Sequence, residues 1–258
     1  MLHNHPVLFV SWRSPKSRRI HSVGRLAFDA PTHQYEFRYI HSALTASKDG
    51  FTPFPEFPRL EGTFRSVDLF PLFANRVMPT TRAGYADFLT ALGLDPATAR
   101  PMAILARTGG RRETDQIELF PMPQHESGNC FATTFLLRAI RYMPQPATDE
   151  RIQRLKAGEK LFWMLDLQNP ADPAAIAVRT EDNVMIGYLP AYLTADFSHL
   201  QEQCGMTQVL VERVNLPPAE AHHRLLCKIE SCWPDSFRPF NTTEFQTIQN
   251  MTPAATPS

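Results

Sequence analysis

The stretch that most constrains the fold spans residues 165–190 and reads LDLQNPADPAAIAVRTEDNVMIGYLP. Apolar residues recur in three short runs, and Ile176 and Val178 alternate with Ala177 and Arg179, which is the period-2 pattern of a half-buried strand. Proline fixes φ, and Asn and Asp side chains bond to their own backbone. The polar segments at residues 169–173 and 181–183 therefore predict two tight turns between three strands.

Gly187 lies inside the third of these runs. A glycine within a strand usually marks a bulge or a close approach of another backbone segment. We therefore expect position 187 not to tolerate a side chain.

The rest of the chain mixes strand-like and helix-like segments. The first half predicts strands at residues 7–12, 20–28 and 33–40, and amphipathic helices that include residues 83–92. The second half predicts strands at residues 131–142, 161–167, 207–214 and 224–232, and a helix at residues 192–203. These alternations predict an α+β fold, with a mixed sheet-and-helix module followed by a second module that is richer in strands.

Length and composition favour two modest domains. The chain has 258 residues, of which 43% are hydrophobic and 20% charged, enough apolar material for two cores. We expect an α+β module at residues 1–121, a second, strand-rich domain at residues 129–240 and a disordered tail at residues 241–258. Residues 121–128 read as a linker between the two domains.

The pattern NPxDxxAIxV at residues 169–178, followed by IGYLP at residues 186–190, resembles the core of a HIRAN domain. The resemblance implies a β-barrel of some six strands with one or two helices. It also implies binding of single-stranded DNA, because characterised members of that family bind single strands and favour a free 3′ end. An unrelated small β-barrel with an Asn-Pro turn is the alternative.

The same resemblance implies a set of DNA-binding residues. It suggests that Arg141 binds a phosphate, that Tyr142 stacks on a base and that Asp172 accepts a hydrogen bond from the terminal 3′-hydroxyl. Tyr188 stands where family members hold a residue near the backbone phosphate. The set is completed by Asn169, Lys160 and Arg179.

Each of these assignments has a plainer alternative. Arg141 and Tyr142 also read as an exposed strand end, and Asp172 as a residue that only shapes an Asx turn. Lys160 and Arg179 also read as solvated strand faces. Ala171 departs from the family, which commonly has an aromatic residue there, and we expect weaker binding of DNA ends as a result.

The first half has a resemblance of its own. The segments VGRLAF (23–28), HQYEFRYI (33–40) and LFPLFANRVMP (69–79) are similar, in this order, to the N-terminal subdomain of HipA-type toxin kinases. The last segment departs from the family because it lacks the usual leucine pair and the following acidic residue. The kinase part of such proteins does not appear, since no H-x-D catalytic stretch follows the first half.

Charge and cysteine content exclude several classes of function. The formal net charge is zero, which excludes a strongly basic nucleic-acid-binding chain. No basic apolar leader opens the sequence and no apolar run is long enough to span a membrane, so we expect a cytoplasmic protein. None of the cysteines forms a C-x-x-C pair, and free thiols are expected for Cys130, Cys204, Cys227 and Cys232.

The sequence offers no recognisable catalytic or metal site. His222, His223, Cys227 and Cys232 do not match the spacing of a standard zinc site. We therefore expect no metal, no cofactor and no enzymatic activity. The predicted function is non-enzymatic binding of single-stranded DNA ends in a bacterial defence or repair system. The alternative is a protein-interaction or antitoxin-like module that binds a partner protein.

Overall fold

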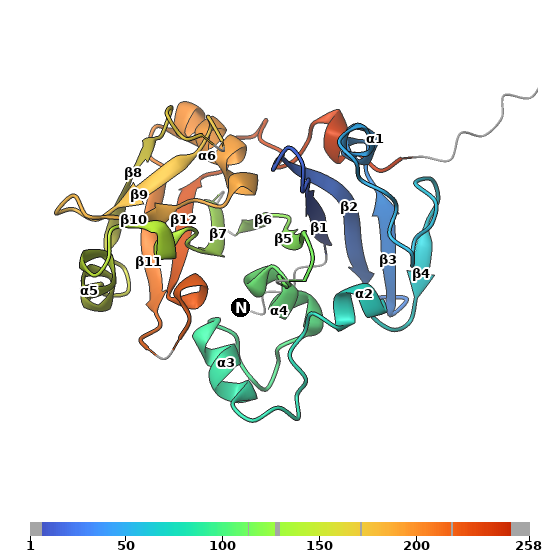
Figure 1. Ribbon diagram of the computed structural model, residues 1–258, viewed down its shortest axis with the longest axis horizontal. Helices are drawn as coiled ribbons and strands as arrows, with labels where there is room; N and C mark the ends of the chain where they lie inside the picture. The colour runs from blue at the N-terminus through green and yellow to red at the C-terminus, as the bar shows by residue number, and fades with distance from the viewer. Residues whose placement is uncertain (1–6, 113, 127–129, 171, 218, 249–258) are drawn as a thin grey trace, which may run out of the picture. The chain divides into compact units, whose positions relative to one another are not determined.

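The structure is a computed structural model that describes residues 7–112, 114–126, 130–170, 172–217 and 219–248. The chain divides into two compact units. Unit 1 comprises residues 1–78, 100–122 and 240–258, and unit 2 comprises residues 79–99 and 123–239. Each unit has its own antiparallel sheet and its own hydrophobic core, which confirms an α+β fold (Figure 1).

Unit 1 is built on a five-stranded sheet, among the described residues, in the order β4-β3-β2-β1-β5. The three strands predicted near the N-terminus are confirmed. The strands are β1 Val7–Arg13, β2 Ile20–Asp29, β3 Gln34–Tyr39, β4 Phe64–Ser66 and β5 Ile117–Pro121, and the helices are α1 Ser42–Lys48, α2 Pro71–Ala74 and α4 Pro101–Thr108.

A buried tyrosine fixes the proline-rich loop of unit 1. The Tyr39 hydroxyl donates a hydrogen bond to the Phe57 carbonyl at 2.9 Å and accepts one from the Phe54 amide at 2.7 Å. The Phe37 and Phe57 rings stack with their centroids 4.1 Å apart. Because proline cannot supply the backbone donors of a regular element, this segment is held by side chains instead.

The segment after residue 240 corrects one expectation. We expected a disordered tail at residues 241–258, but residues 241–248 are ordered against unit 1 and include a short 3₁₀ helix, η3 Thr243–Phe245. The Ile248 amide donates to the Tyr39 carbonyl at 3.0 Å, and the Ile248 side chain joins the core. These contacts offset the entropy cost of ordering the segment. Residues 249–258 lie outside the described residues.

Unit 2 is built on a seven-stranded sheet, among the described residues, in the order β10-β9-β8-β11-β12-β7-β6. The strands are β6 Gln124–Glu126, β7 Cys130–Leu136, β8 Lys160–Leu165, β9 Ile176–Arg179, β10 Met185–Tyr188, β11 Gln208–Val214 and β12 Leu225–Cys232. The helices are α3 Tyr85–Ala91, α5 Ala147–Arg154 and α6 Ala191–Cys204, with 3₁₀ helices η1 Ile140–Tyr142 and η2 Ala221–His223.

One pair of backbone hydrogen bonds joins β10, at one end of this sheet, to the segment just after β7 and so closes a ring of strands. The Arg138 amide donates to the Tyr188 carbonyl, and the Tyr188 amide donates to the Arg138 carbonyl, each at 2.9 Å. Arg138 follows β7 and Tyr188 ends β10, so the strands from β7 through β12, β11, β8 and β9 to β10 form a curled, barrel-like sheet. A curled, barrel-like sheet in the second half is therefore confirmed, and it includes a seventh strand, β6, beside β7.

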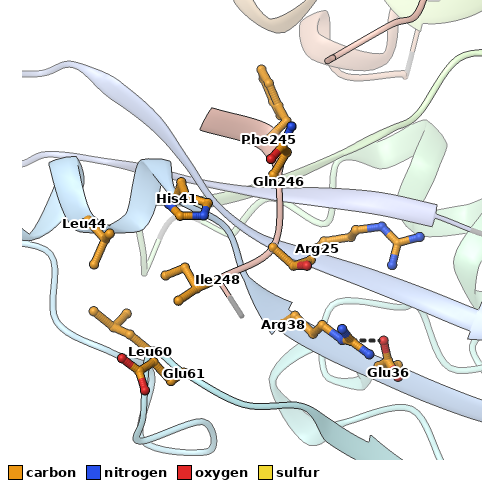
Figure 2. Close-up of a pocket in the computed structure, with 11 residues that line it drawn as sticks. Arg25, Glu36, Arg38, His41, Leu44, Leu60, Glu61, Phe245, Gln246 and Ile248 are labelled. Carbon is orange, nitrogen blue, oxygen red and sulfur yellow. Dashed lines mark ion pairs between the residues drawn. The ribbon is translucent and has the colours of Figure 1, made fainter. Parts of the chain in front are cut away.

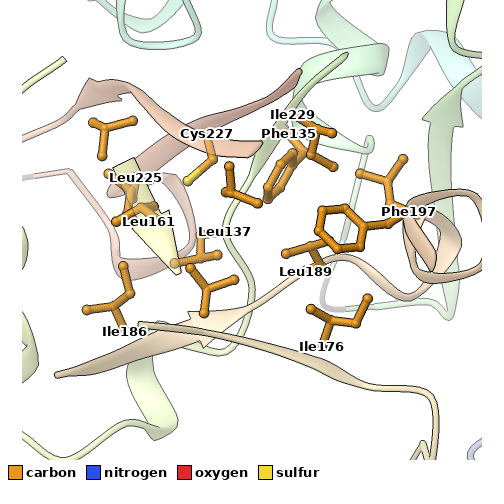
Figure 3. Close-up of a cluster of buried hydrophobic side chains, with 14 of the residues drawn as sticks. Phe135, Leu137, Leu161, Ile176, Ile186, Leu189, Phe197, Leu225, Cys227 and Ile229 are labelled. Atoms are coloured by element: carbon orange, nitrogen blue, oxygen red, sulfur yellow. The ribbon is translucent and has the colours of Figure 1, made fainter. Parts of the chain in front are cut away.

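The inside of the ring is an apolar core (Figure 3). It receives side chains from every strand of the ring and from α6, which contributes Phe197. The Trp163 ring of β8 meets the Phe197 ring edge-on, with centroids 5.0 Å apart. The thiol of Cys227 is also buried here, and burial raises its pKa well above the ordinary range, so it stays protonated as a small apolar group.

The segment at residues 79–99 corrects the predicted domain division. We assigned it to the first domain, but it belongs to unit 2. The Asn215 side chain donates to the Ala91 carbonyl at 3.0 Å, which ties the end of α3 to the loop after β11. Leu89 and Leu92 are buried, whereas Phe88 is only half-buried and meets the His223 ring. The two leucines therefore make the main apolar contact of α3.

Three local expectations for the second half are also corrected. Residues 121–128 are not simply a linker, because β6 pairs with β7. The predicted strand at residues 131–142 ends at Leu136, since Ala139 adopts a left-handed conformation with φ 63° and the chain continues as η1. Cys204 and Cys232 are not free thiols but form a disulfide that links the end of α6 to the end of β12.

Gly187 should be essential for closing the ring. A Cβ atom at this position would lie 2.4 Å from the Arg138 carbonyl oxygen and 2.9 Å from the Leu137 side chain, and the backbone has φ +155°. We expect Gly187→Ala to break the Arg138–Tyr188 pairing and to destabilise unit 2 by roughly 3 kcal/mol or more, as expected for overpacking combined with lost hydrogen bonds.

Gly158→Ala is the matched control, because Gly158 also has a positive φ but a Cβ atom added there would meet nothing within 4 Å. It should show only the smaller cost of backbone strain. Urea unfolding followed by tryptophan fluorescence measures both variants. Equal losses in the two would mean that the close approach to Arg138 does not limit stability.

Candidate nucleic-acid interface

The turn that follows β8 is fixed by its own polar side chains. The Asp172 amide donates to the Asn169 side-chain oxygen at 3.2 Å, and the Ala174 amide donates to the Asp172 carboxylate at 2.9 Å. Asp172 is therefore an Asx-turn residue, as the plainer alternative predicted. A carboxylate has further acceptor capacity beyond this one bond, so the turn does not exhaust what Asp172 can bind.

Tyr188 connects this turn to the closure of the ring. Its hydroxyl donates to the Asp166 carboxylate at 2.9 Å, and the Asn169 side-chain amide donates to the same oxygen at 3.3 Å. Burial and the bond to Asp166 raise the pKa of Tyr188, so the phenol stays protonated as the donor at neutral pH. The backbone of Tyr188 pairs with Arg138, so the ring closure holds the turn through one residue.

Arg141 and Tyr142 lie in η1 and not at the end of a strand as predicted. The left-handed turn at Ala139 redirects the chain, and η1 packs beside β10. The Tyr142 side chain is 69% exposed, and the Arg141 guanidinium lies 4.7 Å from the centroid of its ring. Arg141 also donates to the Tyr142 hydroxyl at 2.5 Å. The two side chains therefore form one exposed cation–aromatic pair.

Lys160 and Arg179 lie in a second group, around the Phe162 ring. The Lys160 ammonium is 5.7 Å and the Arg179 guanidinium 4.8 Å from the centroid of that ring. Phe162 and Arg179 are directly opposite each other in the pairing of β8 with β9. The predicted residues are thus brought together in three groups: the turn with Tyr188, the Arg141–Tyr142 pair, and the Phe162 group.

Sequence reasoning missed three members of this arrangement: Arg138, Asp166 and Phe162. Asp166 lies three residues before Asn169, a spacing at which a carboxylate can meet an Asx side chain within one turn. Phe162 alternates with the buried Leu161, so its outward direction was available from the strand period. Arg138 carried no sequence signal, because its position depends on the pairing across the ring.

The remaining histidine, cysteine and acidic side chains are of the types that ligate metal ions. Among the residues the structure describes, no group of three or more His, Cys, Asp or Glu side chains is placed to hold a metal ion. Burial and the neighbouring His222 lower the pKa of His223 to about 4, so this imidazole is neutral at pH 7. Within the described part of the chain, no helix is long and apolar enough to cross a membrane.

A separate pocket lies on unit 1 (Figure 2). It has a volume of about 1020 Å³. One end is apolar, with Leu44, Leu60 and Ile248, and the other is cationic, with Arg25 and Arg38. Two acidic side chains also line it, Glu36 and Glu61, of which Glu36 binds Arg38 at 2.7 Å and Arg65 at 3.0 Å.

The fold and the turn network of unit 2 define a small β-barrel domain with a polar turn and exposed cation–aromatic pairs beside its closing strand. Residues 131–231 match the HIRAN domain family. The expected HIRAN domain is therefore confirmed for this segment. HIRAN domains are binding modules for single-stranded DNA, which is consistent with DNA binding by unit 2. This match lies in the second half of the chain, so the likeness of the first half to HipA-type kinases stays a prediction.

Two solved structures are similar to part of the chain. A protein from Lactobacillus plantarum is 19% identical, with a TM-score of 0.32, over 40% of this chain and 96% of that one. The HIRAN domain of human HLTF is 14% identical, with a TM-score of 0.28, over 41% of this chain and 78% of that one. The comparison with curated proteins found no match.

The bond between Tyr188 and Asp166 should stabilise the turn. Tyr188→Phe removes the hydroxyl and leaves the ring, so we expect a loss of about 1.5 kcal/mol, the low end for a hydrogen bond to a charged group, because Tyr188 is half-buried. Tyr142→Phe removes an exposed hydroxyl and should change the free energy of unfolding by less than about 0.5 kcal/mol. Equal effects of the two variants in urea titrations would mean that the Tyr188 bond adds nothing to stability.

Proposed function

We propose that unit 2 binds the 3′ end of single-stranded DNA at the turn of residues 166–175 and the neighbouring Arg141–Tyr142 pair, without catalysing a reaction. The observation that carries the proposal is the continuous bonded path from Arg138 through Tyr188 and Asp166 to Asn169 and Asp172, inside the HIRAN segment. This path connects the acceptor Asp172 to Tyr188 of β10, and the exposed Arg141–Tyr142 pair lies in η1, which packs beside β10.

Each group has a chemical role that suits a DNA end. The Arg141 guanidinium has several donors for a phosphate, and the exposed Tyr142 ring offers a stacking surface to a base. The Asp172 carboxylate accepts a hydrogen bond from a terminal 3′-hydroxyl and repels the phosphate that would stand there in an internal nucleotide. The combination selects an end over the middle of a strand. Ala171, where the family commonly has an aromatic residue, lies outside the described residues.

Arg141→Ala should weaken binding to every single strand. If one phosphate contact is lost, the slope of log K against log salt should flatten by about 0.7, the value for one contact on a single strand. Fluorescence anisotropy with a labelled oligothymidylate at several salt concentrations measures this. Arg154→Ala, on the exposed side of α5, is a control that should leave the slope unchanged. An unchanged slope in Arg141→Ala would remove this residue from the interface.

Asp172→Asn should change selectivity more than total affinity. Asparagine keeps an acceptor for the Ala174 amide and so keeps the turn, but it no longer repels a phosphate. We expect the unaltered protein to prefer an oligonucleotide with a free 3′-hydroxyl over the same strand with a 3′-phosphate. In Asp172→Asn the ratio of the two affinities should fall toward one. Competition anisotropy with the two oligonucleotides measures the ratio. Equal binding of both ends by the unaltered protein would refute end recognition.

A second candidate function is binding of a partner protein by unit 1. The pocket of Figure 2 favours it, because the exposed Leu44 and the cationic pair Arg25 and Arg38 lie on one concave surface. The likeness of the first half to HipA-type toxin kinases also favours this alternative. If the protein binds no single strand at low salt but co-purifies with the product of a neighbouring gene, the interaction role replaces DNA binding. A defence or repair setting fits either role.

A further inference from the structure

The outer surface of the closing strands carries a second group of aromatic and basic side chains. The pairings Phe162 with Arg179 and Met164 with Ala177 join β8 to β9, and Ala177 pairs in turn with Tyr188 of β10. Residues directly opposite in paired strands share one face of a sheet. Leu161 and Val178 are in the core, so Phe162, Met164, Arg179 and Tyr188 lie on the outer face.

Phe162 is an unusual residue for such a face. Its neighbours along β8, Lys160 and Met164, are exposed, and the Met164 side chain retains 49% of its accessible surface. Two cations lie over or beside the Phe162 ring, at 4.8 Å for Arg179 and 5.7 Å for Lys160. An aromatic ring framed by Arg and Lys on an open strand surface is the arrangement that single-stranded nucleic acids use, through base stacking and phosphate neutralisation.

The distance along the sheet separates this group from the DNA-end site. Tyr188 of β10 and Phe162 of β8 are separated by β9, and Phe162 lies two residues along its strand from Met164, which is level with Tyr188. At the usual strand spacings this offset corresponds to about 12 Å. A single nucleotide with its 3′-hydroxyl at Asp172 therefore does not reach Phe162. Only a longer strand can occupy both places at once.

We propose that Phe162, Lys160 and Arg179 form a second subsite that takes a nucleotide on the 5′ side of the bound 3′ end. A base stacks on the Phe162 ring, and Lys160 and Arg179 neutralise the adjoining phosphate. The Arg179 guanidinium donates one bond to the Thr180 carbonyl at 3.0 Å and has other donors available for a ligand. This inference rests on the proposed function, and it gives the strand a direction, from the turn of residues 166–175 across β9 and toward the start of β8.

A series of oligothymidylates of increasing length, each with a free 3′-hydroxyl, tests the subsite. Affinity of the unaltered protein should rise with length until the strand reaches Phe162 and then level off. Phe162→Leu keeps an apolar side chain on the strand but removes the stacking surface. It should leave dinucleotide affinity within about twofold and lower the affinity for the longest oligonucleotides roughly five- to hundredfold, the effect of losing one stacked base.

Two further variants separate charge from folding. Lys160→Gln and Arg179→Gln should each flatten the salt slope by about 0.7 for long strands and leave it unchanged for dinucleotides. Lys228→Gln, on β12 and paired with Glu230, is the control and should change neither. Circular dichroism and urea unfolding of every variant identify any that fail to fold. Phe162→Tyr keeps an aromatic ring at this position, so its affinity for long strands must stay close to that of the unaltered protein.

The outcomes distinguish this inference from the function on which it rests. If the unaltered protein binds no oligonucleotide of any length, DNA binding itself is wrong. If it binds them and Phe162→Leu leaves the dependence on length intact, only the second subsite is wrong. If Phe162→Leu lowers affinity equally at every length, Phe162 belongs to the end site and the separate subsite is also wrong.

Discussion

The backbone pair between Arg138 and Tyr188 is the contact on which unit 2 depends. Two hydrogen bonds of 2.9 Å join the edge strand β10 to the segment that follows β7, so this edge of the curled sheet is paired at that point. They form only because Gly187 lacks a side chain, since a Cβ there would occupy the space of the Arg138 carbonyl. The absence of a side chain at Gly187 therefore allows the ring to close around its core.

The same contact determines where the polar groups lie. Because Tyr188 is paired through its backbone, its side chain is held on the outer face, where the hydroxyl reaches Asp166 and, through it, Asn169. The turn carrying Asp172 is thus fixed to the ring by side chains and not only by its own prolines. Side chains that are already held by such bonds lose less entropy when a ligand binds.

Local patterns predicted the strands and the turn but not the contacts between distant segments. The alternation in residues 165–190 was sufficient for β9, β10 and the Asx turn at Asp172. The run FATTFLLRAIRY contains no glycine, proline or asparagine to indicate that Ala139 turns left-handed, so the end of β7 and the placement of Arg141 were wrong. The segments at residues 79–99 and 241–248 were misassigned because burial of Leu89 and Ile248 depends on partners far away in the sequence.

The neutral net charge of the chain limits how such a site can work. With equal numbers of basic and acidic residues, the protein as a whole gives little long-range attraction for a polyanion. In the proposed function, binding comes from a few local contacts: the Arg141–Tyr142 pair, the Phe162 group and the Asp172 turn. Few phosphate contacts imply a shallow salt dependence and modest affinity for the middle of a strand. Selectivity for an end follows, because only there does the acidic turn add attraction instead of repulsion.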